Sequence, residues 1–273
     1  MPLFEGLHVE HLALSDINSV FFSDSPDATV DVKVGEVVAI CGPSNSGKSA
    51  LLHILAGSNL CQNGAVCHGQ VNIRLNNMTE TKRCSSCWYK HVRMVPHKDL
   101  FVSSLTCKET TENYSKLSGG ASFDFGDDDL FDNTLINHLE SRTNLEACAK
   151  LKILSVMNAL TSGPAILLID EPLTTFEQKT MLKLGRLLRH FTQDDVQSFW
   201  TCKHCRIDVE IEQRCVVLAL NSTLLTIEAE DYLNFINKFL FLSKSKQIIF
   251  YGTIDEALRR LRLQSTSDLV SYL

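Results

Sequence analysis

A glycine-rich stretch in the first fifth of the chain has the residue types and spacing of a phosphate-binding loop. Its pattern, Gly-x4-Gly-Lys-Ser, runs from Gly42 to Ser49. The glycines let backbone N–H groups face phosphate oxygens, and the N-terminus of a following helix adds a positive dipole end. We expect Lys48 to reach the β- and γ-phosphates of a nucleotide and Ser49 to hold Mg²⁺. The predicted nucleotide-binding residues are Gly42, Pro43, Ser44, Asn45, Ser46, Gly47, Lys48, Ser49 and Ala50.

The acidic pair Asp170 and Glu171 is a second group suited to phosphate chemistry. It directly follows the apolar run AILLI, residues 165–169. An Asp at the C-terminal end of a buried strand can reach the shell of a magnesium ion, so we expect Asp170 to share the metal with Ser49. We expect Glu171 to polarise an attacking water as a general base. The pair therefore predicts hydrolysis of the bound nucleotide.

These residues require strands and helices that hold them in place. Three predominantly apolar runs, residues 36–41 (apolar from Val37), 165–169 and 215–220, predict buried strands. The segment KSALLHILAG predicts a helix that starts in the glycine-rich loop and ends at Gly57. Strands buried on both faces and separated by helices are typical of a parallel sheet covered on both sides. The expected fold class is therefore α/β.

Other segments give local expectations. GAVCHGQVNIRLNN alternates and carries glycines, which predicts a hairpin, and KFLFLSKSKQIIFYG predicts a terminal hairpin. ASFDFGDDDLFDN, within residues 121–134, carries five Asp and predicts a solvated loop that is an insertion in the domain.

Composition excludes several classes of protein. The chain has 273 residues, 44% of them hydrophobic, which suffices for a sizeable core. The net charge of −6 lacks the basic excess of a nucleic-acid binder, so no nucleic-acid partner is expected. No stretch reaches the run of about 20 apolar residues that a membrane-spanning helix needs. Ten cysteines without a secretion signal suggest reduced thiols.

Four stretches resemble the ATP-binding domain of ABC transporters. They are GPSNSGKSALLHILAG, VPHKDLFVSSLTCKETT, LLIDEPLTTFEQKT and FLFLSKSKQIIFYGTIDEAL. The first and third are typical of the superfamily, and the second and fourth resemble the G (White-type) subfamily. The resemblance implies a P-loop NTPase fold: a RecA-like core, an antiparallel β lobe and a small helical subdomain. Residues 1–273 would then form a single domain without a transmembrane domain.

The same resemblance implies cofactors, partners and a location. ATP and Mg²⁺ would bind at the glycine-rich loop, and a second nucleotide-binding domain would pair head to tail with this one. A membrane-spanning transporter subunit or domain would be coupled to ATP binding and hydrolysis at the cytoplasmic face of a membrane. The alternative is a non-hydrolysing module that binds ATP and regulates or scaffolds a partner. The identity of any transported substrate is not encoded in this domain.

Two positions depart from the family pattern. His97 stands where the family has a Gln that touches Mg²⁺ and signals to the membrane domain. Asn221, after the run CVVLALN, stands where the family has a His that contacts the γ-phosphate. An Asn can donate a hydrogen bond to phosphate but cannot become cationic. A rival alignment gives this role to His204; we prefer Asn221, which makes residues 194–212 an insertion.

The family's signature sequence, Leu-Ser-Gly-Gly-Gln, is the largest departure. It opens a helix about two dozen residues before the aspartate that holds the metal. That spacing leads to LEACAK, residues 145–150, which has neither serine nor glycine. A closer match, KLSGGAS, lies further upstream at residues 116–122 and could be the signature followed by an insertion. We favour residues 145–150, because the run after them matches the family's post-signature helix.

Aromatic and cysteine residues leave two further questions open. Phe4, Phe21 and Phe22 are candidates for stacking on adenine, and core packing is the alternative for each. The pairs Cys84-x2-Cys87 and Cys202-x2-Cys205 have the spacing of zinc ligands. They are so far apart in sequence that a shared zinc site requires the fold to bring them together.

Overall fold

The computed structural model describes most of the chain. The described residues are 2–16, 19–21, 29–58, 66–76, 81–82, 84–85, 87–98, 100–118, 135–141, 145–172, 178–204, 206–225 and 233–273. The Asp-rich segment within residues 121–134, together with Phe22 and Cys205, lies outside the described residues.

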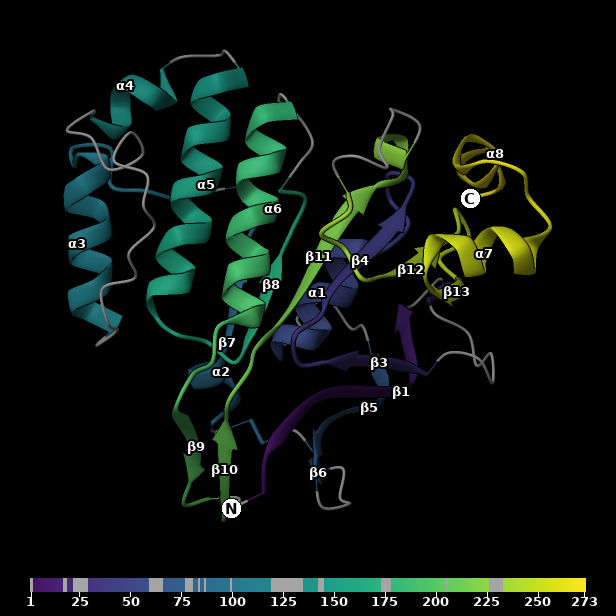
Figure 1. Cartoon of the computed structure of the whole chain (residues 1–273), viewed down its shortest axis with the longest axis horizontal. Helices are drawn as coiled ribbons and strands as arrows, with labels where there is room; N and C mark the ends of the chain where they lie inside the picture. Colours follow the sequence, from purple (N-terminus) through teal and green to yellow (C-terminus); the bar gives the residue numbers. More distant parts are fainter. Residues whose placement is uncertain are drawn as a thin grey trace.

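A six-stranded sheet with the order β13-β12-β4-β11-β8-β7 forms the centre of the molecule (Figure 1). The strands are β4 (Val37–Gly42), β7 (Val92–Val95), β8 (Ile166–Ile169), β11 (Cys215–Asn221), β12 (Lys238–Leu242) and β13 (Ile248–Gly252). All neighbouring pairs are parallel except β12 and β13. The three runs predicted as buried strands form β4, β8 and β11, so the predicted parallel α/β sheet is confirmed.

Alternate residues of each central strand pack into different cores. In β4, Val38 and Ile40 belong to a core shared with α1, whereas Val37, Ala39 and Cys41 belong to a core shared with the helices of the opposite face. Helix α1 (Lys48–Ala56) contributes to the first core. The helices that contribute to the second core are α5 (Leu145–Thr161), α6 (Gln178–Gln193), α7 (Ile254–Leu261) and α8 (Thr266–Tyr272). Burial of both faces explains why these strands are apolar throughout.

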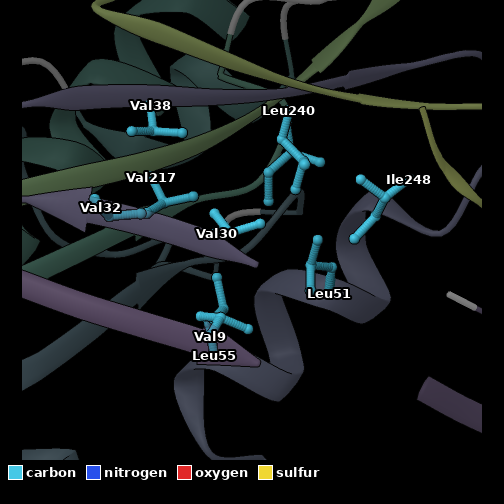
Figure 2. A pocket seen from close by; sticks show the side chains of 10 residues that line it. Val9, Val30, Val32, Val38, Leu51, Leu55, Val217, Leu240 and Ile248 are labelled. Carbon is cyan, nitrogen blue, oxygen red and sulfur yellow. The ribbon is translucent and has the colours of Figure 1, made fainter. Parts of the chain in front are cut away.

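An antiparallel lobe packs against the α1 side of the sheet. It consists of β1 (Phe4–Asp16), β2 (Ser19–Phe21), β3 (Val30–Lys33), β5 (Val66–Leu75) and β6 (Thr81–Lys82). Figure 2 shows the junction, where apolar side chains of the lobe, the sheet and α1 surround a cavity of about 20 Å³. The cavity is lined by Val9, Val30, Val32, Val38, Ile40, Leu51, Leu55, Val217, Leu240 and Ile248. This tight apolar junction holds the lobe against the helix that follows the phosphate-binding loop.

A small helical subdomain has its own core. Helices α3 (Cys107–Ser118) and α4 (Ile136–Glu140) pack on the first half of α5. Their buried contacts are Cys107, Ile136, Leu139, Ala147 and Leu154. Together with the sheet and the lobe, this subdomain completes the predicted architecture. Among the described helices, none is both long and apolar enough to cross a membrane.

The predicted insertion at residues 194–212 forms a two-stranded antiparallel ribbon. Its strands are β9 (Ser198–Cys202) and β10 (Ile207–Ile211), between α6 and β11. In Figure 1 the ribbon extends from the sheet near the short helix α2 (Trp88–His91) and the N-terminus. The backbone N–H of Glu210 donates to the carbonyl of Pro2 at 2.9 Å, which ties the ribbon to the start of the chain.

The hairpins predicted from sequence have different outcomes. The terminal hairpin is confirmed as β12 and β13. The hairpin predicted within GAVCHGQVNIRLNN is wrong, because Val66–Leu75 forms one continuous strand that pairs along β1. The alternating pattern was interpreted correctly as β structure, but Gly69 lies within the strand and does not reverse the chain. The chain continues from β13 into α7, whose start is a capping box between Thr253 and Glu256.

Candidate functional site

The phosphate-binding loop connects the carboxyl end of β4 to the N-terminus of α1. Two of its residues have left-handed backbones, Asn45 with φ of 66° and Gly47 with φ of 94°. At Gly42, a Cβ atom would lie 2.5 Å from Ser46 Oγ and 2.8 Å from the Leu242 carbonyl oxygen. Only glycine fits there, so the sequence pattern reflects steric requirements of this loop.

The side chain of Lys48 is buried at the base of the loop. Its Nζ donates to the carbonyl oxygens of Gly42 at 3.1 Å and Pro43 at 2.9 Å, and lies 3.5 Å from Glu171 Oε1. A buried ammonium needs such acceptors because burial otherwise disfavours its charge. The loop therefore holds one positive charge directly beneath the turn of backbone amides.

Ser49 and Asp170 bring two oxygen ligands together from distant parts of the sequence. Ser49 Oγ donates to Asp170 Oδ1 at 2.9 Å. Asp170 follows β8, is 3% exposed, and donates its backbone N–H to the Val95 carbonyl at 2.9 Å. Hydroxyl and carboxylate oxygens are the ligands that Mg²⁺ prefers, so this pair fits the predicted metal.

Glu171 lies between the lysine and the histidine of the site. Its backbone has φ of 45°, in the left-handed region, which turns its side chain toward the loop. Oε1 lies 3.5 Å from Lys48 Nζ, and Oε2 lies 3.5 Å from Nδ1 of His97. His97 follows β7 and its side chain is 61% exposed. The three ionisable side chains thus form a row across the ends of β4, β7 and β8.

Asn221 ends β11 beside the loop, where it pairs in register with Gly42. Its Nδ2 donates to Ser44 Oγ at 3.3 Å, while its Oδ1 accepts from Thr223 N and Oγ1, both at 3.1 Å. His204 lies in the turn of the β9–β10 ribbon, which precedes β11 and so lies toward the amino end of that strand. This geometry supports Asn221 rather than His204 as the residue facing the nucleotide.

Most of the predicted residues line one pocket of about 640 Å³. Its lining residues are Ser44, Asn45, Gly47, Lys48, Ser49, Ala50, His97, Glu171 and Lys246. Of the other predicted residues, Ser46 is a fully buried residue of the loop, and Gly42 is the last residue of β4. Lys246 is the pocket residue that sequence reasoning missed. It lies in the β12–β13 turn, and only the parallel pairing of β12 with β4 brings that turn to the loop.

The cysteine that precedes the loop does not take part in its chemistry. Cys41 is completely buried in β4, and burial raises the pKa of its thiol far above the usual value, an effect that Lys48 only partly opposes. A protonated, enclosed thiol is neither a nucleophile nor a metal ligand. The ionisable groups that line the pocket are Lys48, Lys246, His97 and Glu171.

The two candidates for the signature sequence occupy opposite ends of helices. Residues 116–118 form the C-terminal end of α3, and Gly119 and Gly120 lie outside the described residues. Residues 145–150 begin α5, the helix that leads directly to β8. A helix N-terminus presents unpaired backbone amides to an anion, whereas a helix C-terminus presents unpaired carbonyl oxygens. The position of α5 therefore supports residues 145–150.

The fold places one of the three aromatic candidates for adenine stacking in the core. Phe4 is 1% exposed, and its ring centroid lies 6.2 Å from that of Trp200 in the core, so its proposed role is wrong. Phe21 ends β2, and Phe22 lies outside the described residues.

Comparisons with known proteins agree with this geometry. The family model described as ABC transporter matches residues 26–174, more than half of the chain, including both the loop and the acidic pair. The sulfate/thiosulfate import ATP-binding protein CysA of Xanthomonas campestris is 28% identical over 189 residues, which are 67% of this chain and 52% of that protein. The branched-chain amino acid transport ATP-binding protein BraG of Pseudomonas aeruginosa is 26% identical over 202 residues, 70% of this chain and 81% of its own length. The match thus spans about half of CysA, and less of some other relatives.

Solved structures share the fold. An ATP-binding subunit of an ABC transporter superposes with a TM-score of 0.62 at 17% identity and covers 98% of both chains. A bacterial Atm1-family ABC exporter with ATP bound gives a TM-score of 0.62 at 14% identity, covering 94% of this chain and 40% of the exporter. The relatives come from several kinds of transporter, so they do not assign the chain to the G subfamily. The family match and the shared fold show that the chain belongs to the ABC transporter family and carries its ATP-binding domain.

Proposed function

We propose that this domain binds ATP with Mg²⁺ and hydrolyses it to drive a membrane transporter. The observation that carries the proposal is the convergence of four groups at the carboxyl ends of β4 and β8. Lys48, Ser49 and Glu171 line one pocket, and Asp170 is hydrogen-bonded to Ser49 at its edge. The family membership and the pocket's size and charge fit a nucleoside triphosphate.

Each group has a distinct part in binding. Lys48 Nζ exchanges its present carbonyl acceptors, those of Gly42 and Pro43, for phosphate oxygens. The loop amides and the N-terminus of α1 hold the remaining phosphate oxygens. Ser49 and Asp170 would hold Mg²⁺, which when bound neutralises charge on the phosphates. The Ser49–Asp170 hydrogen bond already fixes these two ligands at one place.

Glu171 supplies the base for hydrolysis. A water attacks the γ-phosphorus, the bond to the β–γ bridging oxygen breaks, and the carboxylate takes the proton of the water. The carboxylate lies close to both Lys48 and His97, so it belongs to the row that faces the phosphates. His97 replaces the family's Gln here and orients the carboxylate through Nδ1.

A second nucleotide-binding domain completes the site. In this family ATP lies between one P-loop and the signature of the partner domain. The start of α5, residues 145–150, lacks the serine and glycines that grip phosphate. We infer that this chain's own ATP site uses the partner's signature, whereas the partner's site receives a weakened one. A heterodimer with an intact partner therefore suits this sequence better than a homodimer.

A groove beside His97 is the proposed dock for a membrane-spanning partner. It has a volume of about 290 Å³ and lies between β7, α3 and α5, directly after Val95 and Pro96. Its apolar residues Leu100 and Leu117 are 86% and 88% exposed, which leaves apolar surface at the groove that a partner could cover. Docking there would couple His97 to the partner and place the domain at the cytoplasmic face of a membrane. The stretches VPHKDLFVSSLTCKETT and FLFLSKSKQIIFYGTIDEAL resemble the G subfamily, which supports a G-type transporter as that partner.

One observation favours the alternative of a non-hydrolysing module. Asn221 occupies the position of the γ-phosphate histidine, and its amide is already engaged by Ser44 and Thr223. It cannot carry a positive charge or transfer a proton. ATP binding would then remain while turnover fails.

Hydrolysis under single-turnover conditions separates the two functions. ATP binding to the full chain is measured by calorimetry with magnesium, and phosphate release is measured with protein in excess. Glu171→Gln should keep ATP affinity and lower the hydrolysis rate by about 10²–10⁴-fold, the usual contribution of a general base. A wild-type rate equal to that of Glu171→Gln would contradict hydrolysis by this chain without a partner domain, and undetectable binding by both proteins would contradict the whole proposal.

A further inference from the structure

Three cysteines from distant parts of the sequence meet at the amino end of the sheet. Cys84 precedes α2, Cys87 caps it, and Cys202 ends β9 in the ribbon. Their sulfur atoms all lie within 4.8 Å of one another, and the Sγ atoms of Cys84 and Cys202 are 4.0 Å apart. A tetrahedral zinc with bonds of about 2.3 Å places its sulfur ligands about 3.8 Å apart. The cluster therefore has nearly the dimensions of a zinc–thiolate site.

The backbone around Cys84 and Cys87 forms the tight turn that such a site needs. The N–H groups of Cys87 and Trp88 both donate to the carbonyl of Cys84, at 3.3 and 3.0 Å. This turn directs the two sulfurs to the same side, and the ribbon supplies the third. The 4.0 Å separation of the sulfurs of Cys84 and Cys202 is about twice a disulfide bond length, so these two residues are not cross-linked.

Neighbouring side chains support thiolate ligands. The indole Nε1 of Trp200 donates to the Cys87 sulfur at 3.2 Å. N–H donors to ligating sulfur are common around metal centres because they stabilise its negative charge. Trp200 is fully buried, with Trp88 at 5.6 Å and Phe4 at 6.2 Å between ring centroids, so the donor is held rigidly.

We propose that Cys84, Cys87 and Cys202 bind a structural Zn²⁺ that fixes the β9–β10 ribbon to the α2 turn. Zinc suits this donor set because thiolates are soft ligands and the ion accepts tetrahedral sites without redox chemistry. Three protein ligands leave a fourth position. Cys205 completes the second C-x2-C pair in the sequence but lies outside the described residues, so the proposal rests on the other three.

The proposal is independent of ATP hydrolysis, because the cysteines lie away from the nucleotide pocket. Metal content of the full chain, purified in reducing buffer and equilibrated with zinc, is measured by mass spectrometry of the elements. We expect about one zinc per wild-type chain. The zinc content should fall at least tenfold in Cys84→Ser, Cys87→Ser and Cys202→Ser. Cys148→Ser, which removes an exposed cysteine of α5, is the matched control and should keep the metal.

A second measurement keeps the test valid if a variant unfolds. Cobalt added to the metal-free wild-type protein should give the near-ultraviolet charge-transfer absorption of several thiolate ligands, and zinc should displace it. Loss of zinc in Cys205→Ser would identify the fourth ligand, whereas retention would leave that position to water; both support the three-cysteine site. Wild-type protein without zinc or cobalt binding, or zinc retained in Cys84→Ser and Cys202→Ser, would overturn the proposal.

Discussion

The two ends of the central sheet carry sites that are assembled in different ways. At the carboxyl end, the nucleotide pocket comes mainly from one continuous loop and one strand end, Gly42–Ser49 and Asp170–Glu171. At the amino end, the cysteine cluster combines a turn before β7 with the ribbon before β11. The first site depends on local backbone geometry, whereas the second depends on tertiary packing. Changes at one end should therefore leave the other end intact.

The largest effect is expected from Lys48→Ala at the carboxyl end. It removes the buried ammonium that we propose contacts the phosphates, and hydrogen bonds to charged groups contribute about 1.5–3 kcal/mol each. For two such bonds, ATP affinity should fall by roughly 10²–10⁴-fold. Calorimetric titration with MgATP measures this, and the intrinsic fluorescence of Trp88 and Trp200 shows whether the amino end is preserved. Unchanged ATP affinity would remove the basis for the nucleotide site.

Trp200→Ala is the corresponding change at the amino end. It leaves a cavity between Phe4, Trp88 and His91 and removes the donor to the Cys87 sulfur. The free energy of unfolding should fall by about 3–5 kcal/mol, as for other buried aromatic truncations. The neighbouring Phe199 is 54% exposed, so Phe199→Ala should cost less than about 0.5 kcal/mol. Urea unfolding measures both variants.

ATP affinity measured on Trp200→Ala and Phe199→Ala tests whether the two ends of the sheet are independent. The folded fraction of Trp200→Ala should bind MgATP within about twofold of wild type, because Trp200 and its ring partners Phe4, Trp88 and His91 are not among the residues that line the nucleotide pocket. A large loss of ATP affinity in Trp200→Ala, at a temperature where the protein is folded, would show that the two ends are coupled.

The strands and the loop at the carboxyl end of the sheet could be predicted because local sequence patterns specify them. Apolar runs specify β4, β8 and β11, and the loop pattern specifies left-handed positions that only certain residues tolerate. Lys246 could not be predicted, since its place depends on the parallel pairing of β12 with β4. The continuous strand Val66–Leu75 was missed for a similar reason: pairing with β1 overrides the turn preference of its glycine.

Cysteine spacing suggested zinc at the amino end but could not bring the two pairs together. Cys84, Cys87 and Cys202 meet where Trp200 packs against Phe4 and Trp88, three residues from separate elements. Phe4 was predicted as a candidate for adenine stacking because its position upstream of the loop matched that role. The fold instead assigns its ring to this packing cluster, which composition and periodicity alone do not distinguish.

Lys246→Ala tests the pocket residue that only the fold revealed. Its side chain lines the pocket from the β12–β13 turn and is partly exposed, so its attraction to phosphate is weakened by solvent. ATP affinity should fall by about three- to fivefold, equivalent to less than about 1 kcal/mol. Lys244 belongs to the same turn, is exposed and does not line the pocket, so Lys244→Ala is the matched control. Equal affinities for the two variants would exclude Lys246 from the site.

Asn221→His is expected to have the smallest effect. It distinguishes ATP binding from ATP hydrolysis in the pocket at the carboxyl end of the sheet. The residue ends β11 next to Ser44, and we propose that it stands where the family carries a histidine. An imidazole can become cationic near phosphate, which an amide cannot, so single-turnover hydrolysis should rise severalfold while ATP affinity changes little. The gain is limited because Oδ1 of Asn221 also holds the turn at Thr223, and a histidine would lose these contacts. If hydrolysis instead falls together with ATP affinity, Asn221 acts mainly through the structure of that turn. The missing charge would then not be what limits this ATP site.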